Sequence, residues 1–352
     1  MSDHLAAAFP RLASNLPKIV LADLPTPVAK LPLATTFGDR QISIKYDNQT
    51  GRLYGGNKVR KLEYLLQRAS DKNAKRVATF GTVASNHALA TSIYAKSIGL
   101  DCTCLLFHQC RTPNAPSVLN MHLQNETELV PVGGSRKEQV RTMRRCFRDR
   151  DIWVIPAGGS SWLGVVGFVN GALELADQIA SGEVCVPDRL YVANGTMGTA
   201  AGIALGLALA ELPIEVHAVR VTHEFVASPP AMRRLMVKTA TMLNRLDASI
   251  PADLADRTRL CFRDGFFAGG YAHTNEETVS AVDTAHEQLG LTLETTYTGK
   301  AMAALLHDIA RPEFAQRSML FWNTYSSRPL PVGSERPNDV SRLPDEFLRY
   351  YD

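Results

Sequence analysis

Short apolar runs alternate along the chain with longer segments in which apolar residues recur every three or four positions. This alternation is typical of β-strands separated by amphipathic helices. The runs that predict strands are QISIKYD (41–47), RVATF (76–80), DCTCLLFH (101–108), DIWVIPAGG (151–159), DRLYVA (188–193) and IEVHAVRV (214–221). The segments that predict helices are 57–70, 85–99, 135–150, 164–180 and 199–212. The rhythm favours an α/β fold in which parallel sheets are joined by crossover helices.

The composition describes an ordinary globular protein. Of the 352 residues, 45% are apolar and 21% are charged, and the formal net charge is +3. The basic runs near residues 141–150 predict a solvated helix face and no nucleic-acid partner, because aromatic side chains do not alternate with them. No apolar run is long enough to span a membrane, and the first residues lack a secretory pattern, so we expect a cytoplasmic protein. The tail after residue 323 is expected to cross the surface and dock by its last turn.

The six cysteines show no disulfide framework, which fits reduced thiols in a reducing compartment. Cys102, Cys104, His108 and Cys110 are close in sequence, and a metal site is one interpretation of them. Cys102 and Cys104, however, belong to an apolar run that predicts a strand, where they act as small buried hydrophobes. We therefore predict no metal.

Turns between a predicted strand and a predicted helix are the first places to look for a ligand-binding site, because ligands of parallel sheets bind there. The turn GGNK (55–58) puts Lys58 at a glycine-lined helix start, although lysines mostly lie on solvated faces. In FGTVASNHA (80–88), Ser85 and Asn86 either cap a helix or present free backbone N–H groups to an anion. The turn AGGSSWLGVVG (157–167) is predicted to be a polar loop.

The turn ANGTMGTAAG (193–202) has the composition of a phosphate-binding loop. Its glycines allow close backbone approach, and Thr196 and Thr199 offer hydroxyls at a helix N-terminus. It matches neither the dinucleotide fingerprint nor the nucleotide P-loop, so a single phosphate monoester is predicted. Together with Lys58, this loop indicates pyridoxal 5'-phosphate, whose aldehyde bonds an amine. Glycines and neighbouring cations predict a lowered pKa for Lys58.

Four motifs in this order resemble the family of D-cysteine desulfhydrase and 1-aminocyclopropane-1-carboxylate deaminase. They are TGRLYGGNKVRKLEYLL (50–66), ASNHALA (84–90), NGTMGTAAG (194–202) and TYTGKAMAALL (296–306). The resemblance extends from about residue 24 to 324 and implies a tryptophan synthase β-like fold with two open, twisted, mostly parallel sheets flanked by helices. We expect a large cofactor-binding domain of residues 1–60 and 173–352 and a small α/β domain of residues 61–172. A homodimer is also implied.

The resemblance implies roles for individual residues. Lys58 bonds the cofactor and then moves the Cα proton of the substrate, and Tyr271 and Tyr297 face the substrate as acid–base groups. Asn86 holds the phenolic oxygen of the cofactor, and Ser85 binds the substrate carboxylate and has a catalytic part. The expected cofactor-binding residues are Lys58, Asn57, Asn86, Gly195, Thr196, Met197, Gly198, Thr199, Thr298 and Thr324. The expected substrate-binding residues are Ser85, Asn86, His87, Gly159, Tyr271 and Tyr297.

Thr298 and His87 match the desulfhydrases, whereas the deaminases carry glutamate and glutamine at these positions. A carboxylate keeps the pyridine nitrogen of the cofactor protonated, whereas a hydroxyl leaves it neutral, which suffices for β-elimination. Lys300, in the same motif as Thr298, is a rival for the lysine that bonds the cofactor. It lacks a glycine-lined helix start, and we expect it at the surface.

The sequence departs from the family at GTVASNH (81–87) and at Ala88 and Leu89, and most tellingly at residues 321–327. FWNTYSS (321–327) stands where the family has His-Thr-Gly-Gly, so Asn323 replaces the histidine, and Tyr325 and Ser326 replace both glycines. We predict a pyridoxal-phosphate-dependent lyase that eliminates a β-substituent from a small amino acid, with D-cysteine as the leading substrate. The alternatives are ring-opening deamination of aminocyclopropane-carboxylate, a divergent lyase or β-replacement enzyme of biosynthesis, and a catalytically silent cofactor-binding protein.

Overall fold

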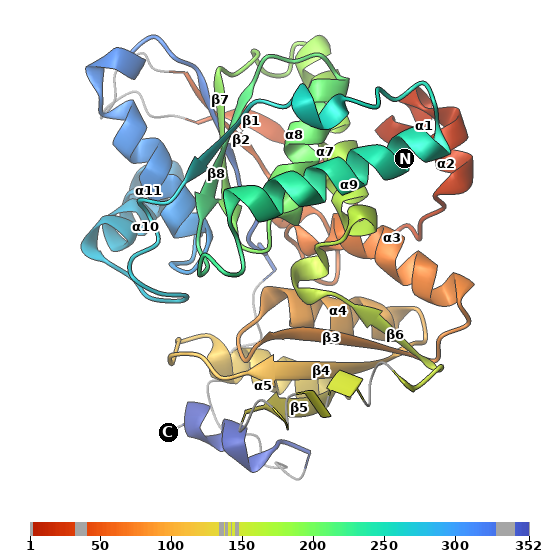
Figure 1. The fold of residues 1–352 in the computed structure, drawn as a ribbon. Coiled ribbons are helices and arrows are strands. Elements are labelled where there is room, and N and C mark those ends of the chain that lie inside the picture. The colour runs from red at the N-terminus through yellow and green to blue at the C-terminus, as the bar shows by residue number, and fades with distance from the viewer. Residues whose placement is uncertain are drawn as a thin grey trace.

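The computed structural model describes residues 3–31, 41–133, 148–328 and 342–351, with single positions between 134 and 147. Two sheets define two lobes, and the larger sheet occupies the upper lobe in Figure 1. The predicted helix at 135–150 lies mostly outside the described residues. Among the helices that are described, none is both long and apolar enough to cross a membrane.

The larger sheet has six strands, and all neighbours are parallel except the first pair. Its order is β1 (Val28–Lys30), β2 (Ile42–Lys45), β10 (Met319–Trp322), β7 (Arg189–Asn194), β8 (Glu215–Arg220) and β9 (Leu260–Arg263). Along β7, Leu190 and Val192 join one hydrophobic cluster, whereas Tyr191 and Ala193 join another on the opposite face. The sheet is therefore buried on both faces, as parallel sheets are.

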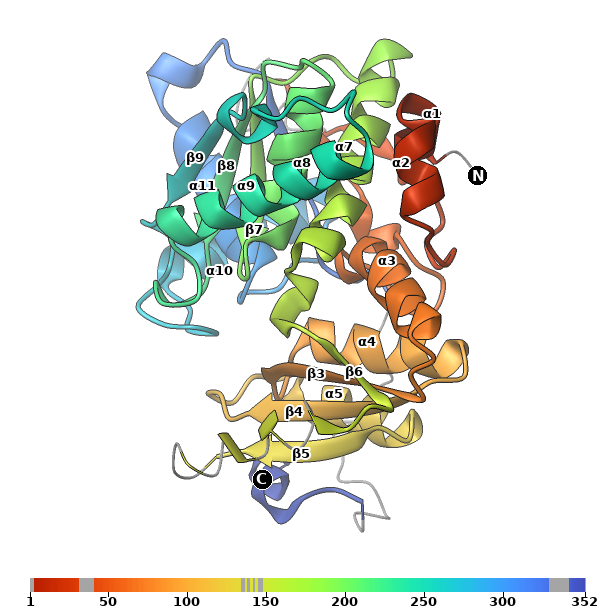
Figure 2. The same cartoon turned by 45° about the vertical axis from the view of Figure 1, so that its right-hand side comes forward.

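The smaller sheet has four parallel strands. Its order is β5 (Glu128–Val132), β4 (Asp101–Phe107), β3 (Arg76–Thr82) and β6 (Ile152–Ile155). Cys102 and Cys104 lie on β4 as free, buried thiols, which confirms their interpretation as small hydrophobes. The C-terminal segment docks beside this lobe (Figures 1 and 2), where the Tyr350 hydroxyl bonds the backbone of Gln109. The predicted docking of the last turn is thus confirmed.

Helices cover both sheets. They are α1 (His4–Ala8), α2 (Pro10–Asn15), α3 (Lys58–Asp71), α4 (Asn86–Ser97), α5 (Ala115–Gln124), α7 (Trp162–Ala180), α8 (Gly198–Leu209), α9 (Pro229–Leu246), α10 (Glu276–Leu289) and α11 (Thr298–Ile309). Short 3-10 turns are η1 (Asp47–Gln49), η2 (Ala157–Gly159), η3 (Leu254–Asp256), η4 (Pro312–Phe314) and η5 (Asp345–Tyr350). The α10–α11 pair lies on one side of the larger sheet, and α7, α8 and α9 lie on the other (Figures 1 and 2).

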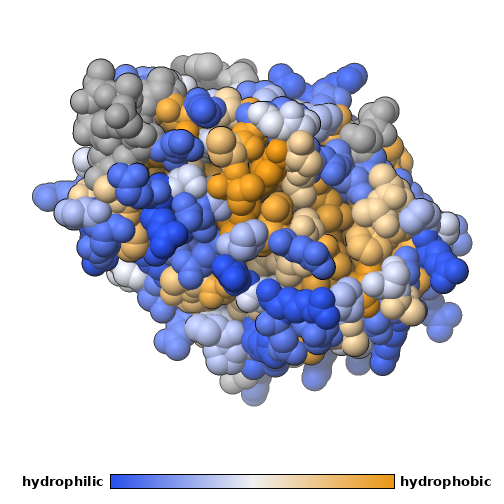
Figure 3. Space-filling model, turned by 90° about the horizontal axis from the view of Figure 1, so that it is seen from above, coloured by the Kyte–Doolittle hydropathy of each residue, from blue (hydrophilic) through white to orange (hydrophobic). Residues whose placement is uncertain are grey.

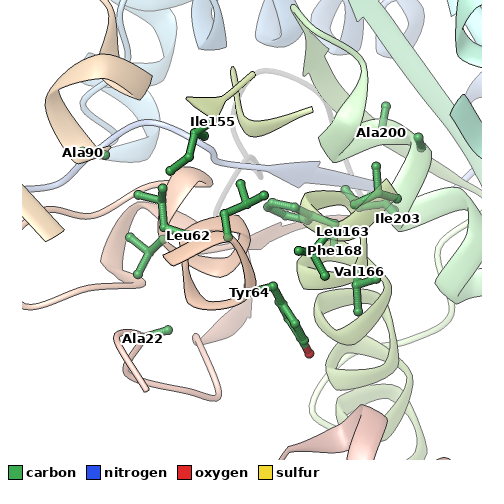
Figure 4. Close-up of a cluster of buried hydrophobic side chains, with 14 of the residues drawn as sticks. Ala22, Leu62, Tyr64, Ala90, Ile155, Leu163, Val166, Phe168, Ala200 and Ile203 are labelled. Carbon is green, nitrogen blue, oxygen red and sulfur yellow. The ribbon is translucent and has the colours of Figure 1, made fainter. Parts of the chain in front are cut away.

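One hydrophobic core joins the two lobes. Figure 4 shows Leu62 of α3 among side chains of α7 and α8, such as Phe168 and Ile203, with Ile155 of the smaller sheet nearby. All four side chains are completely buried. The expected domain borders at residues 60/61 and 172/173 fall inside α3 and α7, which both contribute to this core, and these borders stay a prediction. The shared core fixes the start of α3, where Lys58 lies, between the lobes.

Candidate active site

A cavity of about 560 Å³ lies between the lobes, at the carboxyl ends of the strands. Residues that follow or end β3, β7, β8 and β10 line it, such as Thr82, Asn194, Thr222 and Thr324. The structure brings nearly all the predicted site residues together there, namely Asn57, Lys58, Ser85, Asn86, His87, Gly195, Thr196, Met197, Gly198, Thr199, Tyr271, Tyr297, Thr298 and Thr324. Gly159 is the exception, and its neighbour Gly158 lines the cavity instead.

Lys58 is the first residue of α3 and faces this cavity. Its ammonium donates a 2.9 Å hydrogen bond to the side-chain oxygen of Asn57. Burial lowers the pKa of Lys58 to about 8, although the negative charge of Glu294 acts in the opposite direction. The predicted lowering is therefore present, with desolvation rather than the neighbouring cations as the main cause.

Arg60 anchors the first turn of α3 through a buried ionic cluster. Its guanidinium donates to the carboxylates of Asp47 at 2.8 Å and Glu174 at 2.9 Å, and Lys45 also pairs with Glu174. Burial alone would raise the pKa of Glu174, but Arg60 and Lys45 lower it below its ordinary value. Because removal of one partner would leave an uncompensated buried charge, the cluster holds α3 rigidly behind Lys58.

Lys61 is a site residue that the sequence did not reveal. It lines the cavity with only 1% of its side chain exposed, and its ammonium donates to the carbonyl of Gly158 at 3.1 Å. A Cβ atom added at Gly198 would lie 2.9 Å from this ammonium, so the charge lies directly beside the glycine-rich loop. Among the described residues no carboxylate pairs with it, and burial together with Lys58 lowers its pKa well below the ordinary value. The available signal was its spacing of three from Lys58, which puts both lysines on one side of a helix.

The glycine-rich loop has the geometry of an anion cradle. Met197 adopts a left-handed φ of 69° immediately before α8, and the first residues of this helix, Gly198 and Thr199, line the cavity. The Ser160 hydroxyl contacts that of Thr196 at 2.7 Å and accepts from the Gly198 N–H at 3.2 Å. The prediction of a polar loop at 157–167 is wrong for most of its length, because residues 157–159 form η2 and α7 begins at Trp162. Ser160, between these two elements, supports the cradle. Asn194, buried at its edge, has no hydrogen-bond partner for its side chain within the described structure.

Ser85 and Asn86 open α4 at the opposite lobe. The Ser85 hydroxyl caps the helix by accepting from the Ala88 N–H at 3.2 Å, which confirms the capping interpretation without excluding a ligand role. The Asn86 side-chain oxygen accepts from the Tyr54 hydroxyl at 2.8 Å, and this bond orients the amide. His87 is fully enclosed, with Nε2 2.9 Å from the Thr79 hydroxyl, and burial lowers its pKa well below the ordinary range. His87 is therefore a neutral imidazole.

Tyr271 and Tyr297 come from different elements but form one pair. Their hydroxyls are hydrogen-bonded, and their rings meet edge to face with centroids 5.9 Å apart. The Tyr271 hydroxyl also lies 3.3 Å from the hydroxyl of Thr82, at the end of β3. Burial raises the pKa of Tyr271, and it raises the pKa of Tyr297 further. Both phenols therefore stay protonated at neutral pH.

Thr298 is hydrogen-bonded to a carboxylate that was not among the predicted site residues, that of Glu294. Its hydroxyl donates to the carboxylate of Glu294 at 3.1 Å and accepts from the Glu294 N–H at 3.1 Å. The same carboxylate accepts from the N–H groups of Tyr297 and Thr298 at 2.9 and 2.8 Å and lines the cavity. Burial raises the pKa of Glu294, while these bonds oppose the shift. The contact between Glu294 and Thr298 could not be predicted from the sequence, because a carboxylate just before a helix is typical of a cap.

Lys300 does not lie at the surface, so that prediction is wrong. Its side chain is completely buried, and its ammonium donates to the carbonyls of Phe267 and Gly270 at 2.7 and 3.2 Å. It does not line the cavity, so it does not rival Lys58 there. Tyr325, at the departure from the family motif, lines the cavity, and burial raises its pKa to about 12.

Comparisons with known proteins identify the family of the chain. Residues 19–324 match the family described as pyridoxal-phosphate dependent enzyme. The chain is 32% identical to D-cysteine desulfhydrases of Salmonella paratyphi A, over 86% of this chain and 91% of the relative, and of Klebsiella pneumoniae, over 88% and 94%. A solved ACC deaminase homologue superposes with a TM-score of 0.74 at 29% identity, covering 92% of this chain and 95% of that one. A fungal L-serine ammonia-lyase from Rhizomucor miehei shares the fold, with a TM-score of 0.61 at 16% identity over 93% and 98%.

The fold and the family match define an enzyme that uses pyridoxal phosphate as its cofactor. The chain belongs to the pyridoxal-phosphate dependent enzyme family and, within it, is similar to the D-cysteine desulfhydrases. The predicted cofactor, fold class and family resemblance are thereby confirmed.

Proposed function

We propose that this enzyme is a lyase that eliminates the β-substituent of a small amino acid, with D-cysteine converted to sulfide, pyruvate and ammonia. The observation that carries the proposal is one cavity lined by a sheltered amine, Lys58, and a pair of protonated phenols, Tyr271 and Tyr297. Such a cavity offers a base for the Cα proton and an acid for a leaving group. The names of the relatives support D-cysteine as the substrate.

The residues present fit the cofactor. The Lys61 ammonium and the N–H groups at the start of α8 would hold its phosphate, because they supply hydrogen-bond donors and positive charge beside the glycine-rich loop. The Asn86 amide would bind its phenolic oxygen. When bound, the cofactor supplies an aldehyde for amines and an electron-withdrawing ring that stabilises negative charge at the substrate Cα.

The protein supplies the proton movements. The Ser85 hydroxyl and the N–H groups at the start of α4 bind the substrate carboxylate, because a helix N-terminus favours an anion. Lys58, whose pKa of about 8 leaves a useful fraction of neutral amine, takes the Cα proton. The Cβ–S bond then breaks, and a proton from the Tyr271–Tyr297 pair goes to the departing sulfur. Water converts the resulting aminoacrylate to pyruvate and ammonia.

The position of Glu294 supports a second candidate reaction, the ring opening of aminocyclopropane-carboxylate. The resemblance places Thr298 at the pyridine nitrogen, and because its only proton goes to Glu294, its oxygen has a lone pair to offer. An ionised carboxylate behind that oxygen favours a protonated nitrogen, which is the state that ring opening of aminocyclopropane-carboxylate requires. The similarity to the ACC deaminase homologue points the same way. Ring-opening deamination is therefore the second candidate.

A substrate panel tests the proposal. Purified holoenzyme would receive D-cysteine, L-cysteine, β-chloro-D-alanine and aminocyclopropane-carboxylate, with sulfide, pyruvate and 2-oxobutyrate measured and Lys58→Ala as the control. We expect sulfide and pyruvate from D-cysteine. Formation of 2-oxobutyrate with no sulfide would establish the second candidate instead. Cofactor binding without turnover of any amino acid would identify a silent binder.

We also propose a cytoplasmic homodimer. Figure 3 shows a hydrophobic area in the middle of one face, bordered by hydrophilic residues on the left and below, and such an area is typical of an interaction surface. Light scattering on the eluted peak of a sizing column tests the dimer, and a monomeric mass would contradict it.

A further inference from the structure

Lys300 is a completely buried cation that does not line the cavity. It lies three residues after Tyr297 on α11 and has no exposed surface. Burying an ammonium is costly unless it is paired, yet no carboxylate among the described residues hydrogen-bonds to Lys300, although the negative charge of Glu294 favours its charged form. Its bonding partners are two backbone carbonyls, those of Phe267 and Gly270, and it also lies 5.4 Å from the centre of the Phe267 ring.

Both carbonyls belong to the loop between β9 and α10, which carries Tyr271. This loop has left-handed backbone at Ala268, Gly269 and Ala272, with φ values of 57°, 75° and 59°. Such values are strained for alanine, so the surrounding structure has to hold the loop in place. Lys300 bonds the loop at Phe267, just before the strained Ala268, and again at Gly270, which precedes Tyr271. A cation that donates to two carbonyls across this turn is well suited to fix it.

The loop determines where the Tyr271 hydroxyl lies. That hydroxyl bonds Tyr297 and lies 3.3 Å from the Thr82 hydroxyl. Tyr297 is the N-cap residue of α11, and Lys300 lies in the first turn of the same helix. The N-terminal end of α11 thus carries one phenol of the pair and the cation that holds the other. We infer that Lys300 is the positioning residue that sets the Tyr271 hydroxyl against Tyr297, and this inference rests on the proposed catalytic role of the two tyrosines.

A double-mutant cycle tests the inference on the holoenzyme. Lys300→Met keeps the length of the side chain but removes its donors, and we expect kcat to fall about tenfold to a hundredfold with KM changed less. In a Tyr271→Phe background the same substitution should lower kcat less than about threefold, because the hydroxyl that Lys300 positions is absent. Lys300→Arg keeps donors for both carbonyls and should restore most of kcat. Lys238→Met, on the exposed side of α9, is the matched control and should leave kcat unchanged.

If Lys300→Met lowers kcat equally in the wild-type protein and in the Tyr271→Phe variant, the inference is overturned. A lysine that only supports the fold would have the same effect on kcat in both proteins. If Lys300→Met does not yield folded protein, Lys300→Gln, whose shorter amide cannot span both carbonyls, takes its place with the same expectation. Backbone hydrogen exchange of residues 264–275 gives a readout that does not depend on turnover. We expect faster exchange in Lys300→Met, confined to this loop, and unchanged exchange would refute the contact even if the enzyme acts on a substrate other than D-cysteine.

Discussion

The side-chain amide of Asn57 donates a 2.9 Å hydrogen bond to the hydroxyl of Thr199, 142 residues further along the chain. Asn57 also accepts from the ammonium of its neighbour Lys58, so the amine is linked through one side chain to the glycine-rich loop. This link fixes the spacing between the two ends of the proposed cofactor site.

The Asn57–Thr199 bond predicts coupled effects on cofactor affinity. Asn57→Ala and Thr199→Val should each raise the dissociation constant of pyridoxal phosphate about three- to tenfold, because each removes one buried hydrogen bond. The double variant should be little worse than either single variant. Titration of the apo-enzyme by absorbance measures the constants, and additive losses would show that the two side chains act separately.

Substitution of Lys61 should weaken binding of pyridoxal phosphate through its phosphate group. Lys61→Met should raise the dissociation constant of pyridoxal phosphate about tenfold to a hundredfold, because a charge-assisted bond to the phosphate is removed. Binding of pyridoxal, which lacks the phosphate, should change little. The exposed Lys238→Met variant serves as the control for loss of a lysine. An equal loss for both ligands would mean that Lys61 supports the fold and not the phosphate.

Removal of either hydroxyl of the tyrosine pair should impair loss of the leaving group but not removal of the Cα proton. Tyr271→Phe and Tyr297→Phe should each lower pyruvate formation about a hundredfold, because the proton donor for the leaving group is impaired. Exchange of the Cα hydrogen with solvent deuterium, followed with D-alanine, should persist because Lys58 performs it. Mass spectrometry of the recovered alanine measures the exchange. A parallel loss of both activities would assign the tyrosines to binding or to the Cα proton.

The depressed pKa of Lys58 predicts how cofactor capture depends on pH. The neutral amine is the form that attacks an aldehyde, and its fraction rises as pH rises through the value of about 8. The rate at which apo-enzyme takes up pyridoxal phosphate, followed by absorbance, should therefore climb around pH 8 and level off above it. A rate that climbs only near the ordinary lysine value of 10.5 would show that burial does not shift Lys58.

Much of this site could be predicted from the sequence, because its signals are local. The glycines around Lys58 and those of the loop at residues 195–202 mark turns wherever they occur, and apolar periodicity placed α3 and α8 within one residue of their observed starts. These elements meet because parallel strands end at one edge, which is a general rule of α/β folds.

The charged residues of the interior could not be predicted in this way. Arg60 pairs with Glu174, 114 residues away, and Lys300 donates to the carbonyl of Phe267, 33 residues before it. The burial of each cation therefore depends on partners that are distant in the sequence. A lysine or arginine in a sequence is expected at the surface in the absence of such partners. Glu294 was missed for a related reason, since its side chain caps α11 and also bonds Thr298.

The central claim is that Lys58 is the amine that bonds the cofactor, and chemical trapping tests it most directly. Holoenzyme reduced with borohydride would be digested, and the peptide that carries the phosphopyridoxyl group would be sequenced by mass spectrometry. We expect the label on Lys58 and no label in Lys58→Ala. A label on Lys61 or Lys300, or undiminished labelling of the Lys58→Ala protein, would contradict the site described above.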